Sequence, residues 1–542
     1  MTARGRRKWF ATAALAALPA LALLGLLLAP LIRLLLEAFG SGSDVTGAPA
    51  SIWLPWQDDY LRWRVLWSLA QAGATCGLAL LLGVPLAWVL ARLEFGGRVW
   101  VLRALMLPFV VPTLVAALGV LALWGPQGLF SGWLSIDLQG TPWLLLYGNL
   151  FFNLCLVVRA GVEALQRVSA TQLAAARSLG ATPWRAFWRV EWPAMAPWLA
   201  ASLCLVFLYC FAGFGLALLL GGPRYATVEV EIYSLVAHEL QLGQASVLAL
   251  WMLLLNGAVA LAYAWLERRL GTPQSCQPVP RVRPQGSAGW LALALAMAVL
   301  ALLCLAPVLA IVWRGLSLGW LAWQQLFDDE VVAALANTLR FSGLALLMSA
   351  VLGVLHALTA QTAVLWRAAA MLPFVISPVT AALGLLLLYP QATASLWLLL
   401  GAYAVLAYPF VAQSMAAALD AMPVHLLQAA RTLGASPWRC FWRVTLPVLA
   451  PALRRGLAFA GATAVGEFAV TLFLSRPEWA TLTTLIYQRL GRPGQDNLDA
   501  AMALACVLML LALLLFAAID GLGSADGFGQ QGTRAQTRSA HA

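Results

Sequence analysis

One polar segment of this 542-residue chain occurs twice, and this repeat constrains the fold more than any other feature. Residues 173–198 are LAAARSLGATPWRAFWRVEWPAMAPW, and residues 427–452 are LQAARTLGASPWRCFWRVTLPVLAPA, at a constant shift of 254. Between residues 175 and 197, 16 of 23 positions are identical. Both copies lie in a basic interval between long apolar runs. The chain is therefore predicted to be an internal duplication that presents the same polar surface twice.

The apolar runs decide the class of protein. Hydrophobic residues make up 62% of the chain and charged residues 10%, and the mean hydropathy is +0.84. A water-soluble protein of this composition would expose far more apolar surface than water tolerates. We therefore predict an all-α integral membrane protein, in which a helix of about 20 residues crosses the hydrocarbon layer.

Twelve apolar runs are long enough to be membrane-spanning helices, six in each half of the chain. Those of the first half lie near residues 9–32, 65–91, 101–123, 143–162, 197–220 and 245–266. Those of the second half lie near residues 289–313, 340–365, 368–389, 396–418, 448–474 and 500–519. Because six is an even number, both halves have the same orientation, and we predict two parallel repeats related by an axis along the membrane normal.

The polar intervals divide the chain into five parts. These are an N-terminal tail (1–8), a first repeat (9–266), a Pro-rich linker (267–288), a second repeat (289–519) and a polar tail (520–542). Arginines gather after the second, fourth and sixth runs, which predicts that both termini and both copies of the repeated segment face the cytoplasm. The net charge of +11 does not indicate nucleic-acid binding. The arginines cluster at the ends of apolar runs, which is the pattern of loops that face anionic membrane lipid.

Each repeated segment has the pattern of two short helices joined by a turn. Gly180 permits a left-handed backbone, Thr182 can cap a second helix, and Pro183 suits the first turn of that helix. An apolar ridge along the cytoplasmic surface is expected from Trp184, Phe187 and Trp188. An amphipathic anchor in the membrane surface is one interpretation. Two near-identical copies instead favour a docking element for a partner with twofold symmetry.

These motifs resemble the EAA loop in the permease subunits of type I ATP-binding-cassette importers. In that family a Glu-Ala-Ala triplet is followed by three residues and a Gly, and the segment ends near a Pro. The matching residues here are Ala174, Ala175, Ala176, Gly180, Ala181, Phe187 and Pro193 in the first copy, and Gln428, Ala429, Ala430, Gly434, Ala435, Phe441 and Pro447 in the second. The resemblance implies that each copy inserts into a cleft on a separate ATPase subunit. The Glu of the family is Ala174 in one copy and Gln428 in the other, so docking through shape is expected in place of a salt bridge.

Further segments resemble thiamine importer permeases in which two halves are fused in one chain. The similar segments are WQDDYLRWRVLWS (56–68), LFFN (150–153), RVEWP (189–193), GGPRYATVEVEIY (221–233) and TTLIYQRLG (483–491). The resemblance implies a bacterial inner-membrane location, thiamine or its phosphates as cargo, a periplasmic substrate-binding protein and a cytoplasmic ATPase homodimer. Fused ferric-iron importer permeases are a more distant likeness, so ferric iron is the alternative cargo.

The chain is predicted to be a transport subunit without catalytic residues. It has no G-x-x-x-x-G-K-[ST] phosphate-binding motif, and Lys8 is its only lysine. ATP and Mg²⁺ are therefore expected on the partner ATPase and not here. The four histidines and eight cysteines are scattered along the chain, so neither a metal site nor another cofactor is expected.

Acidic residues inside the apolar runs are the candidates for contact with cargo. Glu467 lies in AVGEFAV, where the first half has Gly213, and a carboxylate in a spanning helix is costly unless it faces water or a partner. It is either a contact for a cationic cargo or a carboxylate at a helix end that pairs with an arginine or meets water. Glu229, Glu231 and Tyr233 are placed in the outer part of the first half, where they flank the cargo or meet the binding protein.

One further acidic residue is expected to have a structural role. Glu163 lies four residues after Arg159, so the two side chains can pair on one helix face. A carrier coupled to protons or sodium ions would need several intramembrane acids at matching places in the two halves. Glu467 has no matching acid, so an ion-coupled carrier is the weaker alternative function.

Overall fold

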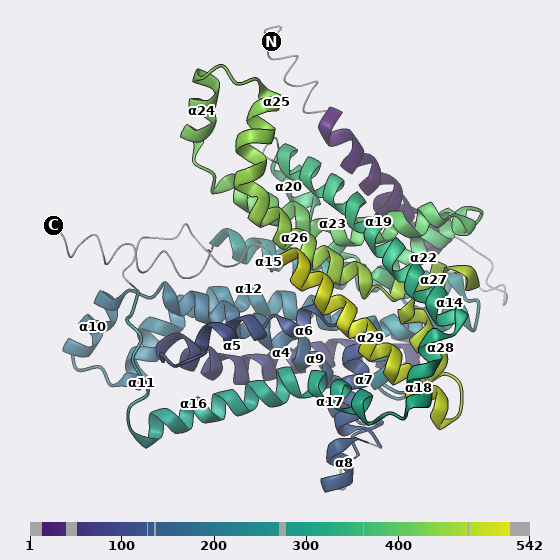
Figure 1. Ribbon diagram of the computed structural model, residues 1–542, viewed down its shortest axis with the longest axis horizontal. Coiled ribbons are helices and arrows are strands. Elements are labelled where there is room, and N and C mark those ends of the chain that lie inside the picture. Colours follow the sequence, from purple (N-terminus) through teal and green to yellow (C-terminus); the bar gives the residue numbers. More distant parts are fainter. Residues whose placement is uncertain are drawn as a thin grey trace.

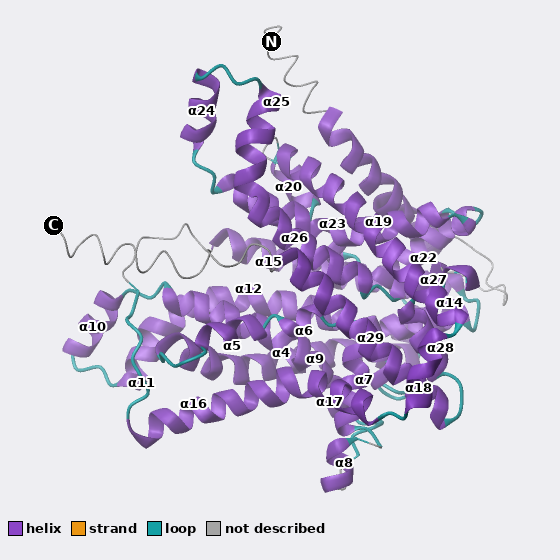
Figure 2. Ribbon diagram, in the orientation of Figure 1, coloured by secondary structure: helices purple, strands orange, loops and turns teal. Residues whose placement is uncertain are grey.

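The structure, a computed structural model, is built almost entirely of helices (Figure 1, Figure 2). It describes residues 14–39, 51–126, 128–134, 137–269, 278–360, 363–474 and 476–520. Within these ranges the β pairing consists of two isolated bridges, Leu93 with Val282 and Ser169 with Pro278. The predicted all-α class is therefore confirmed. The predicted tails 1–8 and 520–542 lie outside the described residues, apart from Asp520.

Ten helical segments in the described ranges are long and apolar enough to cross a membrane. In the first half they are Ala14–Phe39, Asp59–Arg92 (α4), Thr113–Ser131, Pro142–Gln166 (α9), Pro183–Phe211 and Leu242–Leu266. In the second half they are Gly286–Ser317, Asp329–Thr359 (α19), Leu396–Asp420 (α23) and Gln495–Ile519. Each overlaps one of the twelve predicted runs, but the limits differ by as much as 14 residues. The predicted run at 101–123, for example, is divided into α5 (Arg98–Ala104), α6 (Leu107–Val110) and a span that begins at Thr113.

The other two predicted spans differ from expectation. The run at 368–389 is divided into α21 (Leu372–Val375) and α22 (Pro378–Leu388), because Pro373 and Pro378 each begin a new helix. With 11 residues, α22 is about 16 Å long, roughly half the hydrocarbon thickness. The run at 448–474 is divided into α26 (Leu446–Val465), whose sequence includes Arg454 and Arg455, and α27 (Ala469–Leu474).

The duplication extends to individual helices. α9 and α23 begin and end at residues exactly one repeat shift apart, as do α12 (Trp192–Phe211) and α26. The segments that follow also correspond: α13 (Phe214–Leu220) to α27, and α14 (Val228–Ala237) to α28 (Leu482–Leu490). One hydrogen bond is equivalent in the two halves, because the N–H of Val228 donates to Ser68 and that of Leu482 donates to Thr338, both at 2.9 Å.

The first helix of each half crosses onto the other half. α2 (Ala29–Phe39) packs against α22 of the second half, and α17 (Ala306–Ser317) packs against α7 (Thr113–Trp124) of the first. Each crossing is close because a glycine lies at the contact. A Cβ atom on Gly119 would lie 2.5 Å from the carbonyl oxygen of Pro307, and one on Gly384 would lie 3.0 Å from that of Pro30.

A tyrosine from the opposite half stabilises each crossing. Pro30 and Pro307 follow wider, π-helical turns, η1 (Leu24–Leu28) and η3 (Ala301–Leu305). Proline has no N–H to donate, so a carbonyl group of the preceding turn loses its helical partner, and in a membrane it needs another. Tyr389 donates its hydroxyl hydrogen to the Gly25 carbonyl at 3.0 Å, and Tyr147 donates to the Leu302 carbonyl at 2.5 Å. The two halves therefore complete each other's backbone hydrogen bonding.

Gly119→Ala is expected to lower the free energy of unfolding by about 1–3 kcal/mol, because the added methyl group would collide with the Pro307 carbonyl. The control is Gly77→Ala in α4, where a Cβ meets nothing within 4 Å and alanine favours the helix by about 1 kcal/mol. Thermal unfolding of the purified protein in detergent should show a lowered midpoint for Gly119→Ala alone. Equal midpoints for the two variants would contradict the close crossing.

Candidate functional site

The first repeated loop (173–198) contains a short helix, a left-handed turn and a capped second helix. α10 (Ala170–Ser178) ends before Gly180, whose φ of +79° lies in the left-handed region that favours glycine. α11 (Pro183–Ala186) begins after Thr182, whose hydroxyl oxygen accepts a hydrogen bond from the N–H of Arg185 at 3.4 Å. The backbone roles predicted for Gly180, Thr182 and Pro183 are confirmed.

The second repeated loop (427–452) has the same conformation. α24 (Val424–Thr432) precedes Gly434, whose φ is +78°, and α25 (Pro437–Cys440) follows. The hydroxyl oxygen of Ser436 accepts from the N–H of Arg439 at 3.4 Å, as Thr182 does in the first loop. The exchange of Thr for Ser preserves the cap, because both side chains offer an oxygen at the same position.

The second helix of each loop differs from the prediction, because it does not lie separately along the surface. α11 continues through a π-helical turn, η2 (Phe187–Glu191), into α12, and α25 continues through η6 (Phe441–Thr445) into α26. Proline normally breaks a helix because it lacks an N–H and collides with the preceding turn. The wider turn before Pro193 and Pro447 accommodates the ring, so each loop continues into a membrane helix without a break.

The two loops expose the same side chains. Leu179 and Leu433 are each 87% exposed, and Trp184 and Trp438 are also exposed. Among the residues matched to the importer motif, the exposed ones are Ala174, Ala175, Gly180, Pro193, Gln428, Ala429, Gly434 and Pro447, and the half-buried ones are Ala176, Ala181, Phe187, Ala430, Ala435 and Phe441. Figure 1 shows α10 and α24 projecting from the same end of the molecule. The protein therefore presents two matching surfaces, each with exposed apolar residues.

The predicted aromatic ridge is present in both loops. The ring centroids of Trp184 and Trp188 lie 5.6 Å apart, and those of Trp184 and Phe187 lie 6.3 Å apart. In the second loop the Trp438 ring lies 5.5 Å from Trp442 and 6.5 Å from Phe441. The rings brace one another at the start of each membrane helix, which holds the exposed tryptophan in place.

A buried ion pair fixes the first loop but has no counterpart in the second. The Glu191 carboxylate accepts from Arg92 Nε at 3.1 Å and from Trp88 Nε1 at 3.1 Å, and both Arg92 and Glu191 are buried. These contacts join η2 to the end of α4. The equivalent residue of the second loop is Thr445, so the two loops are anchored differently. The pattern of the repeated segment did not predict this anchor, although Glu191 is the one acidic residue within the first copy.

Glu467 caps a helix. Its Oε1 atom accepts from the N–H of Val470 at 3.0 Å, in the first turn of α27, and the residue is buried. Its backbone carbonyl accepts from the Thr483 hydroxyl at 3.1 Å, which ties α28 to the same point. Of the two interpretations of Glu467, the structure favours a carboxylate at a helix end, where backbone N–H groups stabilise its charge.

Glu229 and Glu231 lie in α14, which is too short to span a membrane. The Oε2 atom of Glu231 accepts from the Tyr60 hydroxyl at 2.9 Å and pairs with Arg64 Nε at 3.2 Å, which fastens α14 to α4. Glu229 is fully buried, and this burial raises the pKa of its carboxyl group to about 8, with the Ser377 hydroxyl opposing the rise. Both acids are therefore buried, Glu231 against α4 and Glu229 beside Ser377 of the second half.

Four aromatic rings meet where the two halves face each other. Phe214 and Phe468, which are equivalent residues, stack at 5.7 Å with an angle of 21° between the rings. Tyr233 lies 5.7 Å from Phe214, and its equivalent Tyr487 lies 5.4 Å from Phe468. We call these four residues the aromatic closure. It follows the C-terminal ends of α12 and α26, opposite to the ends that carry the repeated loops.

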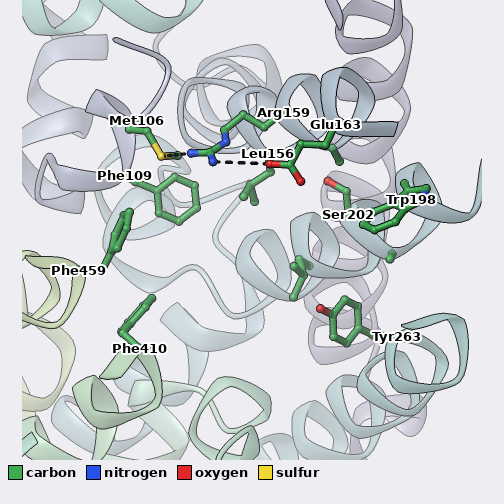
Figure 3. Close-up of a pocket in the computed structure, with 13 residues that line it drawn as sticks. Met106, Phe109, Leu156, Arg159, Glu163, Trp198, Ser202, Tyr263, Phe410 and Phe459 are labelled. Carbon is green, nitrogen blue, oxygen red and sulfur yellow. Dashed lines mark hydrogen bonds and ion pairs between the residues drawn. The ribbon is translucent and has the colours of Figure 1, made fainter. Parts of the chain in front are cut away.

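A cavity of about 560 Å³ lies between the halves on the loop side of the aromatic closure (Figure 3). Its lining residues are Met106, Phe109, Leu156, Arg159, Ala160, Glu163, Trp198, Ala201, Ser202, Leu205, Tyr263, Phe410 and Phe459. Trp198 and Phe211 are separated by about 20 Å along α12, at 1.5 Å per residue. The space between the halves is therefore open near the loops and closed by packed rings further along.

The charged residues of this cavity come from α9. Arg159 Nη2 lies 3.7 Å from Glu163 Oε1, which confirms the predicted pairing, and Arg159 also donates to the sulfur of Met106. At the equivalent positions of the second half, Gln413 donates to the sulfur of Met371 at 2.9 Å. None of the four predicted cargo-path residues, Glu467, Glu229, Glu231 and Tyr233, lines the cavity. The four-residue spacing of Arg159 and Glu163 predicts their pairing but not the cavity that they line.

The sequence is similar to those of known transport proteins. The family described as binding-protein-dependent transport system inner membrane component matches residues 80–272 and 344–521, one match in each half. The chain is 27% identical over 514 residues to a thiamine transport system permease protein of Haemophilus influenzae, covering 88% of this chain and 91% of that protein. It is 28% identical over 497 residues to the protein of the same name from Salmonella typhimurium, with 88% and 92% covered. A shorter match, 35% identical over 152 residues, covers 27% of this chain and 54% of the sulfate transport system permease protein of Escherichia coli.

Glu191→Gln is expected to lower the free energy of unfolding by about 3–5 kcal/mol, because it leaves the buried Arg92 charge without its partner. The control is Glu94→Gln in the exposed pair of Arg281 and Glu94, where a loss of at most about 1 kcal/mol is expected. Thermal unfolding of both variants in detergent measures the difference. A midpoint for Glu191→Gln that matches the control would show that the buried pair does not anchor the loop.

Proposed function

Because the chain belongs to the family of binding-protein-dependent transport system inner membrane components, we propose that it is the permease subunit of an ATP-binding-cassette importer for thiamine. Two of the relatives described above carry thiamine transport in their names, and each aligns with 88% of the chain. This favours thiamine over ferric iron. The cargo would cross the membrane unchanged, so the subunit performs no chemical reaction.

The observation that carries this proposal is the presence of two matching loops at one end of the molecule (Figure 1). An ATPase with twofold symmetry offers two equivalent clefts, and the loops provide two equivalent surfaces. Three exposed arginines surround each surface, Arg177, Arg185 and Arg189 in the first loop and Arg431, Arg439 and Arg443 in the second. Such a concentration of positive charge supports a cytoplasmic location for both loops and for the chain termini.

Docking would depend on shape and apolar contact. The family's Glu position holds Ala174 in one loop and Gln428 in the other, and both residues are exposed. Leu179 and Leu433, beside the left-handed glycines, are the most exposed large apolar side chains of the loops. We propose that they enter the clefts of an ATPase homodimer, where they would bury apolar surface that faces water in the free permease. ATP and Mg²⁺ would be bound by that partner.

The arrangement of the cavity supports transport by alternating access. The aromatic closure separates the cavity from the end of the molecule opposite the loops. With the loops in the cytoplasm, this is the inward-facing state. ATP-driven closure of the ATPase dimer would bring the loops together and part the rings, which opens the path toward a periplasmic binding protein. Hydrolysis would then restore the observed state.

An ion-coupled carrier is less well supported. Glu467, the residue that favoured it, accepts a backbone hydrogen bond from Val470 as a helix cap. A proton relay needs a carboxylate that meets water or a second titratable group along a path. The energy for transport is therefore assigned to the partner ATPase.

Uptake by the reconstituted system tests the cargo and its energy source. Proteoliposomes that contain the permease, its ATPase and its binding protein should accumulate radiolabelled thiamine only with ATP, and an uncoupler should have no effect. Excess ferric ion should not compete. Uptake that persists without ATP but stops with an uncoupler would identify an ion-coupled carrier, and displacement of thiamine by ferric ion would identify an iron importer.

Gly180→Val and Gly434→Val are each expected to abolish co-purification with the ATPase and ATP-driven uptake. A branched side chain at a φ of nearly +80° costs on the order of 1–3 kcal/mol, so the loop leaves its docking conformation. The control is Gly343→Val in α19, where an added Cβ atom meets nothing within 4 Å. All three variants should reach the membrane in normal amounts. Normal uptake by both loop variants would refute the docking assignment.

A further inference from the structure

We infer that the cavity between the halves is the cargo site of the inward-facing state, and that it selects a cation that carries an aromatic ring. This inference rests on the proposed function and deepens it, because it assigns the residues that hold the cargo. The cavity is the right size for a small molecule, since about 560 Å³ falls within the range of roughly 300–1,000 Å³ found for ligand sites. The chemistry of its two walls identifies the kind of molecule.

The second half provides an aromatic wall. Leu156 and Leu205 line the cavity from the first half, and the equivalent residues of the second half, Phe410 and Phe459, line it from the opposite side. The Phe410 and Phe459 rings are nearly parallel, at 22°, with centroids 6.2 Å apart. The ring faces of phenylalanine attract cations and stack with flat heterocycles. The first half adds the rings of Phe109, Trp198 and Tyr263, but at these two duplicated positions only the second half has rings.

The first half provides the charge. Glu163 is the one acid among the described residues that line the cavity, and its side chain is 52% exposed. At the equivalent position the second half has Ala417, so the negative charge is on one wall only. Figure 3 shows one carboxylate oxygen of Glu163 directed toward Arg159 and the other directed away from it. The separation of 3.7 Å between Arg159 and Glu163 makes this a loose pair, which leaves the carboxylate able to bind a second cation.

A buried hydroxyl group also lines the cavity. Ser202 lines the cavity, is only 7% exposed, and its Oγ atom has no hydrogen-bond partner among the described residues. Figure 3 places Ser202 near Glu163, with its oxygen turned to the same part of the cavity. A buried polar group without a partner is costly, and a ligand with a hydrogen-bond donor or acceptor would remove that cost. The carboxylate, the hydroxyl and the two rings together suit a charged heterocycle with polar substituents.

Two substitutions at the charged wall should change affinity in opposite directions. In the complex of permease and ATPase in lipid nanodiscs, without nucleotide or binding protein, Glu163→Gln should weaken binding of radiolabelled thiamine roughly tenfold, since it leaves the Arg159 charge alone in the cavity. Arg159→Gln, which introduces the residue of the second half, Gln413, should strengthen that binding severalfold because it leaves Glu163 alone. A pair with only a structural role would give losses of affinity in both variants.

The aromatic wall and the charge can be separated with a neutral probe. Phe459→Leu, which introduces the residue of the first half, Leu205, should weaken binding of thiamine and of an analogue that lacks the quaternary nitrogen. Glu163→Gln should weaken binding of thiamine and leave binding of the neutral analogue unchanged. The matched control is Glu37→Gln, in the pair of Arg33 and Glu37 with the same four-residue spacing on α2, which should leave both affinities unchanged.

The outcomes distinguish this inference from the proposed function. ATP-dependent thiamine uptake by the unsubstituted system, combined with unchanged thiamine affinity in Glu163→Gln and Phe459→Leu, would overturn the cavity assignment and leave the function intact. Absence of thiamine uptake by the unsubstituted system would overturn the function itself. Opposite shifts for Glu163→Gln and Arg159→Gln, with an unchanged control, would establish the cavity as the cation site.

Discussion

The crossing of each first helix onto the opposite half is the contact on which the rest of the structure depends. A lipid environment offers no hydrophobic driving force between helices, so close packing and hydrogen bonds must hold the halves together. Gly119 and Gly384 permit the close approach, and the prolines they meet leave carbonyl groups that tyrosines of the other half satisfy. Neither half completes its own hydrogen bonding alone, and the cavity between them exists because these two crossings define their separation.

The duplication provides a symmetric frame, and the functional features lie where the two halves differ. The loops, their glycine turns and their caps are equivalent, as a partner with twofold symmetry requires. The cavity walls are unlike, because the ion pair lies in one half only and Phe410 and Phe459 stand where the other half has leucines. A single molecule of cargo has no twofold axis, so a site for it gains specificity from such differences. The anchor at Glu191, absent at Thr445, makes the loops themselves unequal in their attachment.

The local features of the repeated segment could be predicted because they depend on neighbouring residues. The left-handed turn at Gly180, the cap at Thr182 and the pairing of Arg159 with Glu163 all follow from spacing and backbone chemistry. The helix crossings and the cavity could not be predicted, since they depend on contacts between residues far apart in the sequence. The role of Glu467 also depends on tertiary structure. An acid in an apolar run suggests contact with a charged cargo, but in the structure its carboxylate accepts a hydrogen bond from the N–H of Val470. Two of the twelve predicted spans also differ. Prolines divide the run at 368–389 into short helices, and Arg454 and Arg455 make the run at 448–474 more polar.

The π-helical turn before Pro193 has a mechanical consequence. From Pro183 to Phe211 the chain forms one continuous helical segment of 29 residues, about 40 Å long, with the aromatic closure just beyond its far end. The same construction begins at Pro437 in the other half. A tilt imposed on the loop end of this segment would be carried along the helix, past Pro197, to Phe211, which Ala212 and Gly213 connect to Phe214. The backbone of each segment therefore connects a repeated loop to the aromatic closure.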